Sequence, residues 1–474
     1  MEQAQGHPWK WHRLAHVCRN WRHVISMSPR RLDLRILCEY GAPIESILDS
    51  WPTLPLVVKF NAGWTTHIPR NVMAALRRPD RLCEIDLHVT SSMLPSIVEV
   101  TQKPCQELES IRITVEVGPS TPGPSILVRN AFLGGSAPHL RDIKLDGIAF
   151  PFPEIRQVLL STNNLVELHL FNIPNDGYFS PHDLVIGLST LVQLKRLTVD
   201  FHSPPSSPPP SMPRPPQRTT LRSLMSLDFH GAREYLEGFV ARIDLPAICK
   251  IAIRLFNDIF FTIPQFRQFI LCLNALRSPA RVIVKHSVDS VGVYFEGGKL
   301  SSENCSLGTS CGQLGRQLSF VTQILSQLSA LLSSVHSLDI QSDDGLPIGE
   351  EDVDSTRWLE LFQPFTHVTG VRVWEKFVPG IVQALAMEGM TADVLPELTS
   401  LHLDRYRRSL SVAKAAEQFV ATRKLSGRTI SLTSDDEDHG VCPLRPTVLL
   451  HWSTYSLPGS VSTVPIAHAA HAGP

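Results

Sequence analysis

The sequence has no long apolar run and no excess of charge of either sign. No stretch of about 18 uncharged apolar residues occurs, so no membrane-spanning helix is predicted. The first 30 residues carry tryptophan, arginine and histidine instead of the apolar core of a secretory signal. The formal net charge is −1, from 44 basic and 45 acidic residues. Because this balance lacks the basic excess of a nucleic-acid-binding surface, we expect neither nucleic acid nor a membrane as a partner.

Cysteine is sparse, and its spacing excludes the common metal and disulfide patterns. The nine cysteines include no C-x-x-C pair, and the 19 histidines form no H-E-x-x-H or H-x-H motif. We therefore expect free thiols, no metal and no cofactor. Reduced cysteines are typical of proteins of the cytoplasm and nucleus, and we expect one of these locations.

An apolar pattern of the form L-x-x-L-x-L recurs through most of the chain. Ten triplets fit it in two blocks, and within each block their first residues are 24 to 33 residues apart. The first block contains Leu82, Ile85, Leu87; Leu108, Ile111, Ile113; Leu140, Ile143, Leu145; Leu165, Leu168, Leu170; Leu194, Leu197, Val199; Leu224, Leu227, Phe229; and Ile248, Ile251, Ile253. The second block contains Val335, Leu338, Ile340; Val368, Val371, Val373; and Leu398, Leu401, Leu403.

The pattern predicts one strand in every repeat. The last two apolar residues of each triplet alternate with other residues, mostly polar, which is the period of a strand with one buried face. The segments between triplets have helical apolar spacing, for example at Ile155, Val158 and Leu159. Strand, helix and parallel strand in series form right-handed crossovers that stack into a curved sheet with outer helices. We therefore predict an α/β leucine-rich-repeat solenoid, with an ordinary α/β sheet of similar strands as the alternative.

Two stretches interrupt this repeat. The proline-rich stretch 203–217 can form neither a helix nor a central strand, so we predict an exposed loop there. The middle of the chain, 256–334, is irregular. Within it we expect strands at 281–285 and 291–295, followed by a Ser/Cys/Gly-rich loop at 301–313.

An amphipathic helix is predicted next, from the spacing of Leu314, Leu318, Val321, Leu325, Leu328 and Leu332. The acidic stretch 342–354 is expected to be a loop, and a last strand is expected at about Thr429 to Leu432. The predicted organisation is a helical segment over 1–40, the solenoid over 41–425 and a flexible tail over 426–474.

Residues Gly308 to Gly312, GTSCG, match G-x-S-x-G, the pattern around the nucleophile of many hydrolases. That chemistry needs a strand directly before the serine, and the preceding SSENCSL has no strand signal. We therefore expect Ser310 to lie in a Ser/Gly loop, and we expect the chain not to be an enzyme.

The N-terminal stretch 9–40 reads WKWHRLAHVCRNWRHVISMSPRRLDLRILCEY. Three- and four-residue steps place one set of residues on a single helix face: Trp11, Leu14, Val17, Cys18 and Trp21. The form L-x-x-V-C-R-x-W-R, followed by a short strand, resembles the final part of an F-box. Together with the repeats it resembles the F-box-like, leucine-rich-repeat proteins of mushroom-forming fungi.

Proteins of this family are thought to be substrate receptors of cullin-type ubiquitin ligases. Their F-box docks a Skp-type adaptor and their repeats hold the substrate, and the resemblance implies the same roles here. The opening helix of an F-box, with its L-P-x-E-x-L motif, has no counterpart in MEQAQGHPWKW. Two interpretations of the N-terminal helix therefore remain, adaptor docking and a cap on the first turn of the solenoid. The alternative function is a stand-alone repeat scaffold with no role in ubiquitination.

The solvated positions of the predicted strands would line the concave face of the solenoid. Their charges are of mixed sign, which suits a protein partner better than a uniformly charged one. Arginine and aromatic side chains are frequent anchors of protein interfaces. On this basis the expected partner-binding residues are Arg112, His169, Phe171, Arg254, Arg372 and Trp374.

Overall fold

In the computed structural model of the chain, the described residues are 18–27, 35–38, 48–49, 54–63, 65, 67–116, 132–149, 152–204, 218–256, 262–273, 278–297, 303–342, 355–386, 394–404 and 409–434. The predictions for the proline-rich stretch beyond Pro204, for the acidic stretch beyond Ser342 and for the tail beyond Ser434 lie outside these residues.

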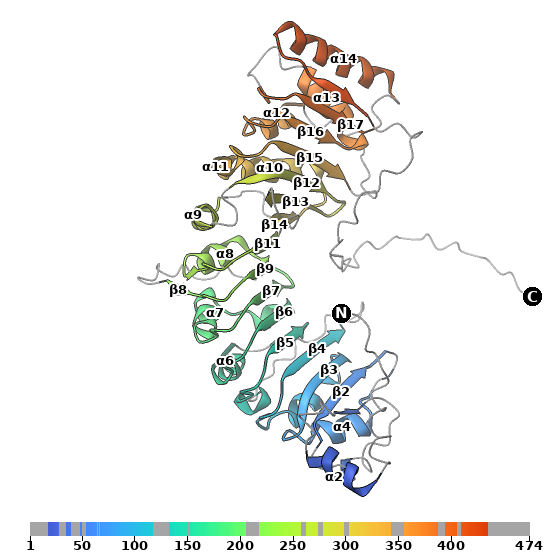
Figure 1. Cartoon of the computed structure of the whole chain (residues 1–474), viewed down its shortest axis with the longest axis vertical. Coiled ribbons are helices and arrows are strands. Elements are labelled where there is room, and N and C mark those ends of the chain that lie inside the picture. The colour runs from blue at the N-terminus through green and yellow to red at the C-terminus, as the bar shows by residue number, and fades with distance from the viewer. Residues whose placement is uncertain are drawn as a thin grey trace, which may run out of the picture.

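One mixed but mostly parallel sheet of 16 strands runs through the molecule (Figure 1). In spatial order its strands are β1 (Ile36–Cys38), β2 (Leu56–Asn61), β3 (Leu82–Thr90), β4 (Ser110–Glu116), β5 (Asp142–Asp146), β6 (Glu167–Ile173), β7 (Arg196–Phe201), β9 (Ser226–Gly231), β11 (Lys250–Phe256), β14 (Glu303–Ser310), β13 (Ser290–Gly297), β12 (Pro279–His286), β15 (Ser337–Ser342), β16 (Gly370–Val373), β17 (Ser400–Leu403) and β18 (Ser431–Thr433). Strand β13 is antiparallel to both of its neighbours. A separate pair joins β8 (Thr219–Thr220) to β10 (Ile243–Asp244).

The apolar triplets lie in register across the sheet, as the repeat predicts. One line of paired residues runs through Ile85, Ile111, Ile143, Leu168, Leu197, Leu227 and Ile251. A second line, two residues further along each strand, runs through Leu87, Ile113, Leu145, Leu170, Val199, Phe229 and Ile253. None of these side chains is more than 3% exposed. The predicted strand register of the first block is confirmed, and the second block pairs in the same way.

The helices from α4 (Arg70–Leu76) onwards pack against the face of the sheet onto which the triplets point, and with the sheet they enclose one continuous apolar core. In chain order the helices are α2 (Arg19–Met27), α4 (Arg70–Leu76), α5 (Leu94–Val100), α6 (Phe152–Ser161), α7 (Pro181–Leu188), α8 (Arg233–Val240), α9 (Pro264–Cys272), α10 (Leu314–Gln327), α11 (Ser329–Leu332), α12 (Ser355–Phe362), α13 (Val378–Ala386) and α14 (Leu410–Leu425), with short 3-10 turns η1 (Phe132–Gly135), η2 (Asn175–Gly177) and η4 (Glu375–Phe377). The stack bends into an arc, with α6, α7, α8 and α9 on its outer side (Figure 1).

Strands β1 and β2 extend the sheet before the first predicted triplet. Sequence analysis missed β2 because Leu56, Val57 and Val58 are buried in succession and do not follow the L-x-x-L-x-L spacing. Buried Arg81 braces this end of the sheet. Its Nε donates to the carbonyl oxygen of Leu54 at 2.9 Å, which satisfies a backbone group directly before β2.

The irregular middle of the sequence forms an antiparallel meander inside the parallel sheet. Strands β12 and β13 fall on the two predicted strands, and the predicted amphipathic helix forms α10 and α11. The third strand, β14, turns back and pairs with β11, so the spatial order β14, β13, β12 is the reverse of the order along the chain. The series of parallel strands is therefore interrupted by the meander and then resumes at β15.

The expected loop at 301–313 is wrong, because Glu303–Ser310 form strand β14. Cys305, Leu307 and Thr309 are buried at alternate positions. A strand period is therefore present in the sequence, but the serine and glycine residues between these three buried positions weaken the signal, because glycine is uncommon in strands.

A buried polar pair links the carboxyl ends of β12 and β14. The side-chain amide of Gln317 in α10 donates to the carbonyl oxygens of Ser287 at 2.8 Å and Cys311 at 2.6 Å, which follow β12 and β14. Its Oε1 lies 2.8 Å from Nδ1 of His286, and neither side chain has exposed surface. Burial lowers the pKa of His286 to about 4, so the ring is neutral near pH 7.

The two lines of buried paired residues, which begin at Ile85 and Leu87, allow a direct test of which face of each strand packs into the core. Ile113→Ala removes a buried side chain from β4 and should lower the free energy of unfolding by about 2–5 kcal/mol. Thr114→Ala, the next residue on the other face, is the matched control and should cost much less. Urea unfolding measures both, and an equal loss of stability in the two variants would contradict the register.

Buried His286 makes the free energy of unfolding depend on pH. The unfolded imidazole binds a proton below its ordinary pKa of 6.5, whereas the folded one does so only near pH 4. This contribution to stability is therefore present above pH 6.5, and roughly 3 kcal/mol of it is lost as the pH falls to about 4. In His286→Asn the amide can still donate to Gln317 but does not titrate. Urea unfolding between these pH values should show a shallower dependence for the variant, and equal slopes would refute the prediction.

Candidate functional site

The second face of the sheet carries the strand residues that alternate with the core lines, and we call it the concave face. One line on it runs through Asp86, Arg112, Lys144, His169, Thr198, Asp228 and Ala252. The next line contains His88, Thr114, Asp146 and Phe171, and continues after a register shift with Asp200, His230 and Arg254. These are the positions that the triplets predict for the solvated face.

Charged side chains on this face are paired across neighbouring strands. Arg112 of β4 donates from Nε and Nη2 to Asp142 of β5, at 2.9 and 2.7 Å. Arg196 of β7 pairs with Glu167 of β6. Further towards the N-terminus, Lys59 lies 3.5 Å from Glu84. Such exposed pairs contribute little stability each, but together they give the face a nearly neutral, ordered lattice of charges.

An aromatic platform lies at the centre of this lattice. The rings of His169 and Phe171 are stacked, with centroids 5.8 Å apart and planes 6° from parallel. Nδ1 of His169 is 2.9 Å from the hydroxyl of Thr198, and Nε2 is 3.2 Å from Glu167. Burial lowers the pKa of His169, so this imidazole is predominantly neutral at pH 7. The amine of Lys144 lies over the Phe171 ring, 5.3 Å from its centroid.

The backbone of β6 is irregular directly after the aromatic platform of His169 and Phe171. Asn172, next to Phe171, has φ 48°, in the left-handed region that side chains other than glycine and asparagine rarely adopt. The strand register shifts between Leu170 and Ile173 at the same place. The Asn172 amide donates to Asp146 at 2.8 Å, so the irregularity also engages a carboxylate of the neighbouring strand. Nothing in the triplet pattern marks this position.

A second polar cluster follows along the face. Nδ1 of His230 lies 2.8 Å from Asp200, and its ring contacts Phe256 at a centroid distance of 4.6 Å. Burial raises the pKa of Asp228, an effect that nearby Arg254 opposes. The expected residue Arg254 therefore belongs to this cluster. Its strand, β11, is the third strand after β6, the strand that carries Phe171.

Expected residues Arg372 and Trp374 belong to the second block. Arg372 lies on β16, and Trp374 directly follows that strand and is 37% exposed. Strands β14, β13, β12 and β15 separate β16 from β11, so these residues are about 24 Å from Arg254 at a normal strand spacing. The six expected residues therefore share one face of the sheet but form separate clusters, of which Arg112, His169 and Phe171 form one.

Of the expected N-terminal residues, Trp11, Leu14 and Val17 lie outside the described residues. Cys18 and Trp21 are exposed, at and just inside the start of α2. The helix ends at Met27, before the Ser28-Pro29 pair.

One group of side chains has the composition of a metal site. Asp142, Glu167 and His169 each offer a ligand atom within 4.8 Å of the others. The two carboxylates already accept hydrogen bonds or ion pairs from Arg112 and Arg196. A cation there would compete with two guanidinium groups, so the arrangement favours a cross-strand ion-pair network.

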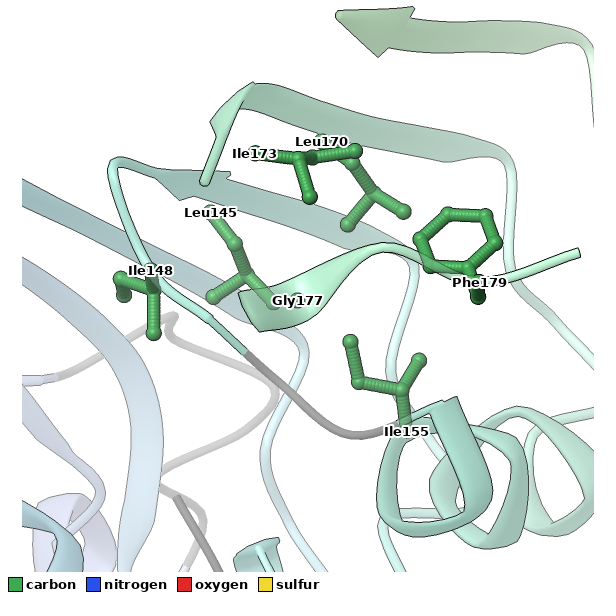
Figure 2. Close-up of a pocket in the computed structure, with 7 residues that line it drawn as sticks. All are labelled: Leu145, Ile148, Ile155, Leu170, Ile173, Gly177 and Phe179. Carbon is green, nitrogen blue, oxygen red and sulfur yellow. The ribbon is translucent and has the colours of Figure 1, made fainter. Parts of the chain in front are cut away.

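The apolar pocket in Figure 2 lies on the core side of the sheet, between β5, β6, α6 and the segment around η2. It is lined by Leu145, Ile148, Ile155, Leu170, Ile173, Gly177 and Phe179. Its space of about 10 Å³ holds about one water-sized molecule, and no side chain of its lining is polar. It is a packing gap in the core, too small for a substrate.

Ser310 is the last residue of β14, so the sequence-based reason for rejecting it, the missing strand, is wrong. Its half-buried position alternates with buried Thr309, which places it on the concave side. In the described part of the chain no hydrogen bond joins Ser310 to an imidazole.

No protein-family model matches the sequence, and no curated protein matches it. A solved structure that resembles the chain is the leucine-rich repeat-containing protein LegL7 from Legionella pneumophila. The two sequences are 13% identical, the match covers 73% of this chain and 99% of that chain, and the TM-score is 0.28. A TM-score this low carries no argument about the fold. The repeat architecture is therefore supported by the strand register of this chain. None of the helices that the structure describes is long and apolar enough to cross a membrane.

The backbone at Asn172 gives a prediction about the platform. Asn172→Ala and Asn172→Gly both remove the hydrogen bond to Asp146, but only glycine adopts a positive φ without strain. The glycine variant should therefore be more stable than the alanine variant, by about 1 kcal/mol. Thermal and urea unfolding measure the difference. A more stable alanine variant would show that the left-handed conformation is not populated.

Proposed function

We propose that the chain is a non-enzymatic protein-interaction scaffold of the leucine-rich-repeat type, which holds a protein partner on its concave face. The observation that carries the proposal is the arrangement of the 16-stranded sheet. Its apolar side chains face the helices, and its other face presents paired charges with a few half-buried aromatic rings. Interfaces of this mixed composition suit proteins better than small substrates.

We further propose that this partner is a substrate for ubiquitination, and that α2 helps to dock a Skp-type adaptor of a cullin-type ligase. The support is the F-box-like sequence of this helix and the exposure of two of its apolar residues. Trp21 and Val24, three residues apart on one helix face, are 50% and 54% exposed. A helix that only closed the core would bury such residues, so their exposure favours docking over capping. The alternative is a stand-alone scaffold with no link to ubiquitin.

Binding of the full chain to a purified fungal Skp-type adaptor tests the ligase proposal. The wild-type chain should retain the adaptor in a pull-down, and the double variant Trp21→Ala, Val24→Ala should lose most of it, because both apolar contacts are removed. Leu160→Ala removes a similarly exposed apolar residue from α6 and is the matched control. Circular dichroism checks that the variants are folded.

Two outcomes count against the proposal. No retention of the adaptor by the wild-type chain would leave the stand-alone scaffold as the function. Equal retention by the wild type and the double variant would mean that the adaptor binds elsewhere than on α2.

A further inference from the structure

We propose that Lys144 and Phe171 together recognise an acidic side chain of the protein partner, flanked there by an apolar group. This inference rests on the proposed binding of a protein at the concave face. The two residues lie on neighbouring strands, β5 and β6, and the Lys144 amine is 5.3 Å from the centre of the Phe171 ring. The aromatic face thus holds the cation at a defined place.

The acidic groups around Lys144 are already engaged. Asp142 accepts from Arg112 and, at 3.1 Å, from the hydroxyl of Ser110. On the other side of Lys144 along β5, Asp146 accepts from Asn172. Glu167 on β6 pairs with Arg196.

Lys144 itself makes no ion pair within the described part of the chain. Its paired neighbours across the sheet are Arg112 and His169, neither of which can compensate a positive charge. Among the described residues Lys144 is therefore a cation in no ion pair, whereas Arg112 and Arg196 on the same face are each paired with a carboxylate. Lys144 is half-buried as a residue. A partner that covers its amine must supply the anion, because an unpaired charge in a dry interface is strongly unfavourable.

The structure also indicates which anion fits. Asp142 and Asp146 lie two residues before and after Lys144 on β5, and Glu167 lies on neighbouring β6, so a phosphate chain or a densely anionic polymer would meet three carboxylates near this position. A single carboxylate can reach the amine, and the methylene groups or apolar neighbour that accompany it can lie on the Phe171 ring. That ring is held in place by its stacking on His169, so binding orders few side chains.

Selection of phage-displayed random peptides on the immobilised full chain tests the proposal. The selected peptides should be enriched in Asp or Glu next to Phe, Leu or Trp. A synthetic peptide of the selected sequence should bind Lys144→Glu and Lys144→Gln at least about tenfold more weakly than wild type, because a charge-assisted contact is lost. The same peptide with its acidic residue changed to Lys should bind K144E better than wild type.

Lys195→Glu is the matched control, because Lys195 is exposed on the turn before β7 and is not on the concave lines. It makes the same change of charge and should leave binding close to wild type. If K144E and K144Q bind the peptide no more weakly than K195E, the proposed recognition by Lys144 is overturned. Selected peptides without acidic residues would overturn it too.

Phe171→Ala separates this inference from the proposed function. Peptides without acidic enrichment whose binding is lost in F171A would refute recognition by Lys144 but support binding at the concave face. Binding that neither F171A nor K144E alters would count against both. Circular dichroism of each variant confirms that a loss of binding is not a loss of fold.

Discussion

The fixed register of parallel strands is the constraint on which the structure depends. A repeat of about 30 residues cannot bury enough apolar surface by itself to offset the entropy of ordering its backbone. Pairing at a constant register brings Ile111, Ile143 and Leu168 into one line, so each repeat shares its core with the next. A slip of one residue would turn every such side chain to the opposite face. The same register that builds the core therefore also sets the order of side chains on the concave face.

The strand register can largely be predicted from the sequence, because aliphatic side chains at a spacing of two identify both the strand and its buried face. The meander is harder to predict. β12 and β13 contain valine, isoleucine and phenylalanine and are visible in the sequence. In β14 the buried Cys305, Leu307 and Thr309 alternate with serine and glycine, which weaken the strand signal. The reversed order of the three strands has no sequence signal. It results from pairing between distant segments, which local patterns do not encode.

In the candidate site, too, features set by the local sequence can be predicted, whereas contacts between distant segments cannot. The face on which Arg112, His169 and Phe171 lie follows from alternation along their strands. Their partners do not follow from it, because Asp142, Thr198 and Lys144 reach Arg112, His169 and Phe171 from neighbouring strands. The left-handed backbone of Asn172, beside Phe171, is not predicted by the pattern either. The special position of Lys144 is visible only after every nearby carboxylate has been assigned a partner.

The reversed meander has a consequence for how the chain is made. A regular solenoid can grow from one end, since each new strand adds to the strand made just before it. Here β11 ends at Phe256, and the strand that pairs with its free edge, β14, begins only at Glu303. During synthesis that edge remains an open template for any strand of matching shape, including one from a second nascent chain. Assembly of the molecule thus depends on a delayed, non-local closure in its middle, in which β14 joins β11 to the rest of the meander.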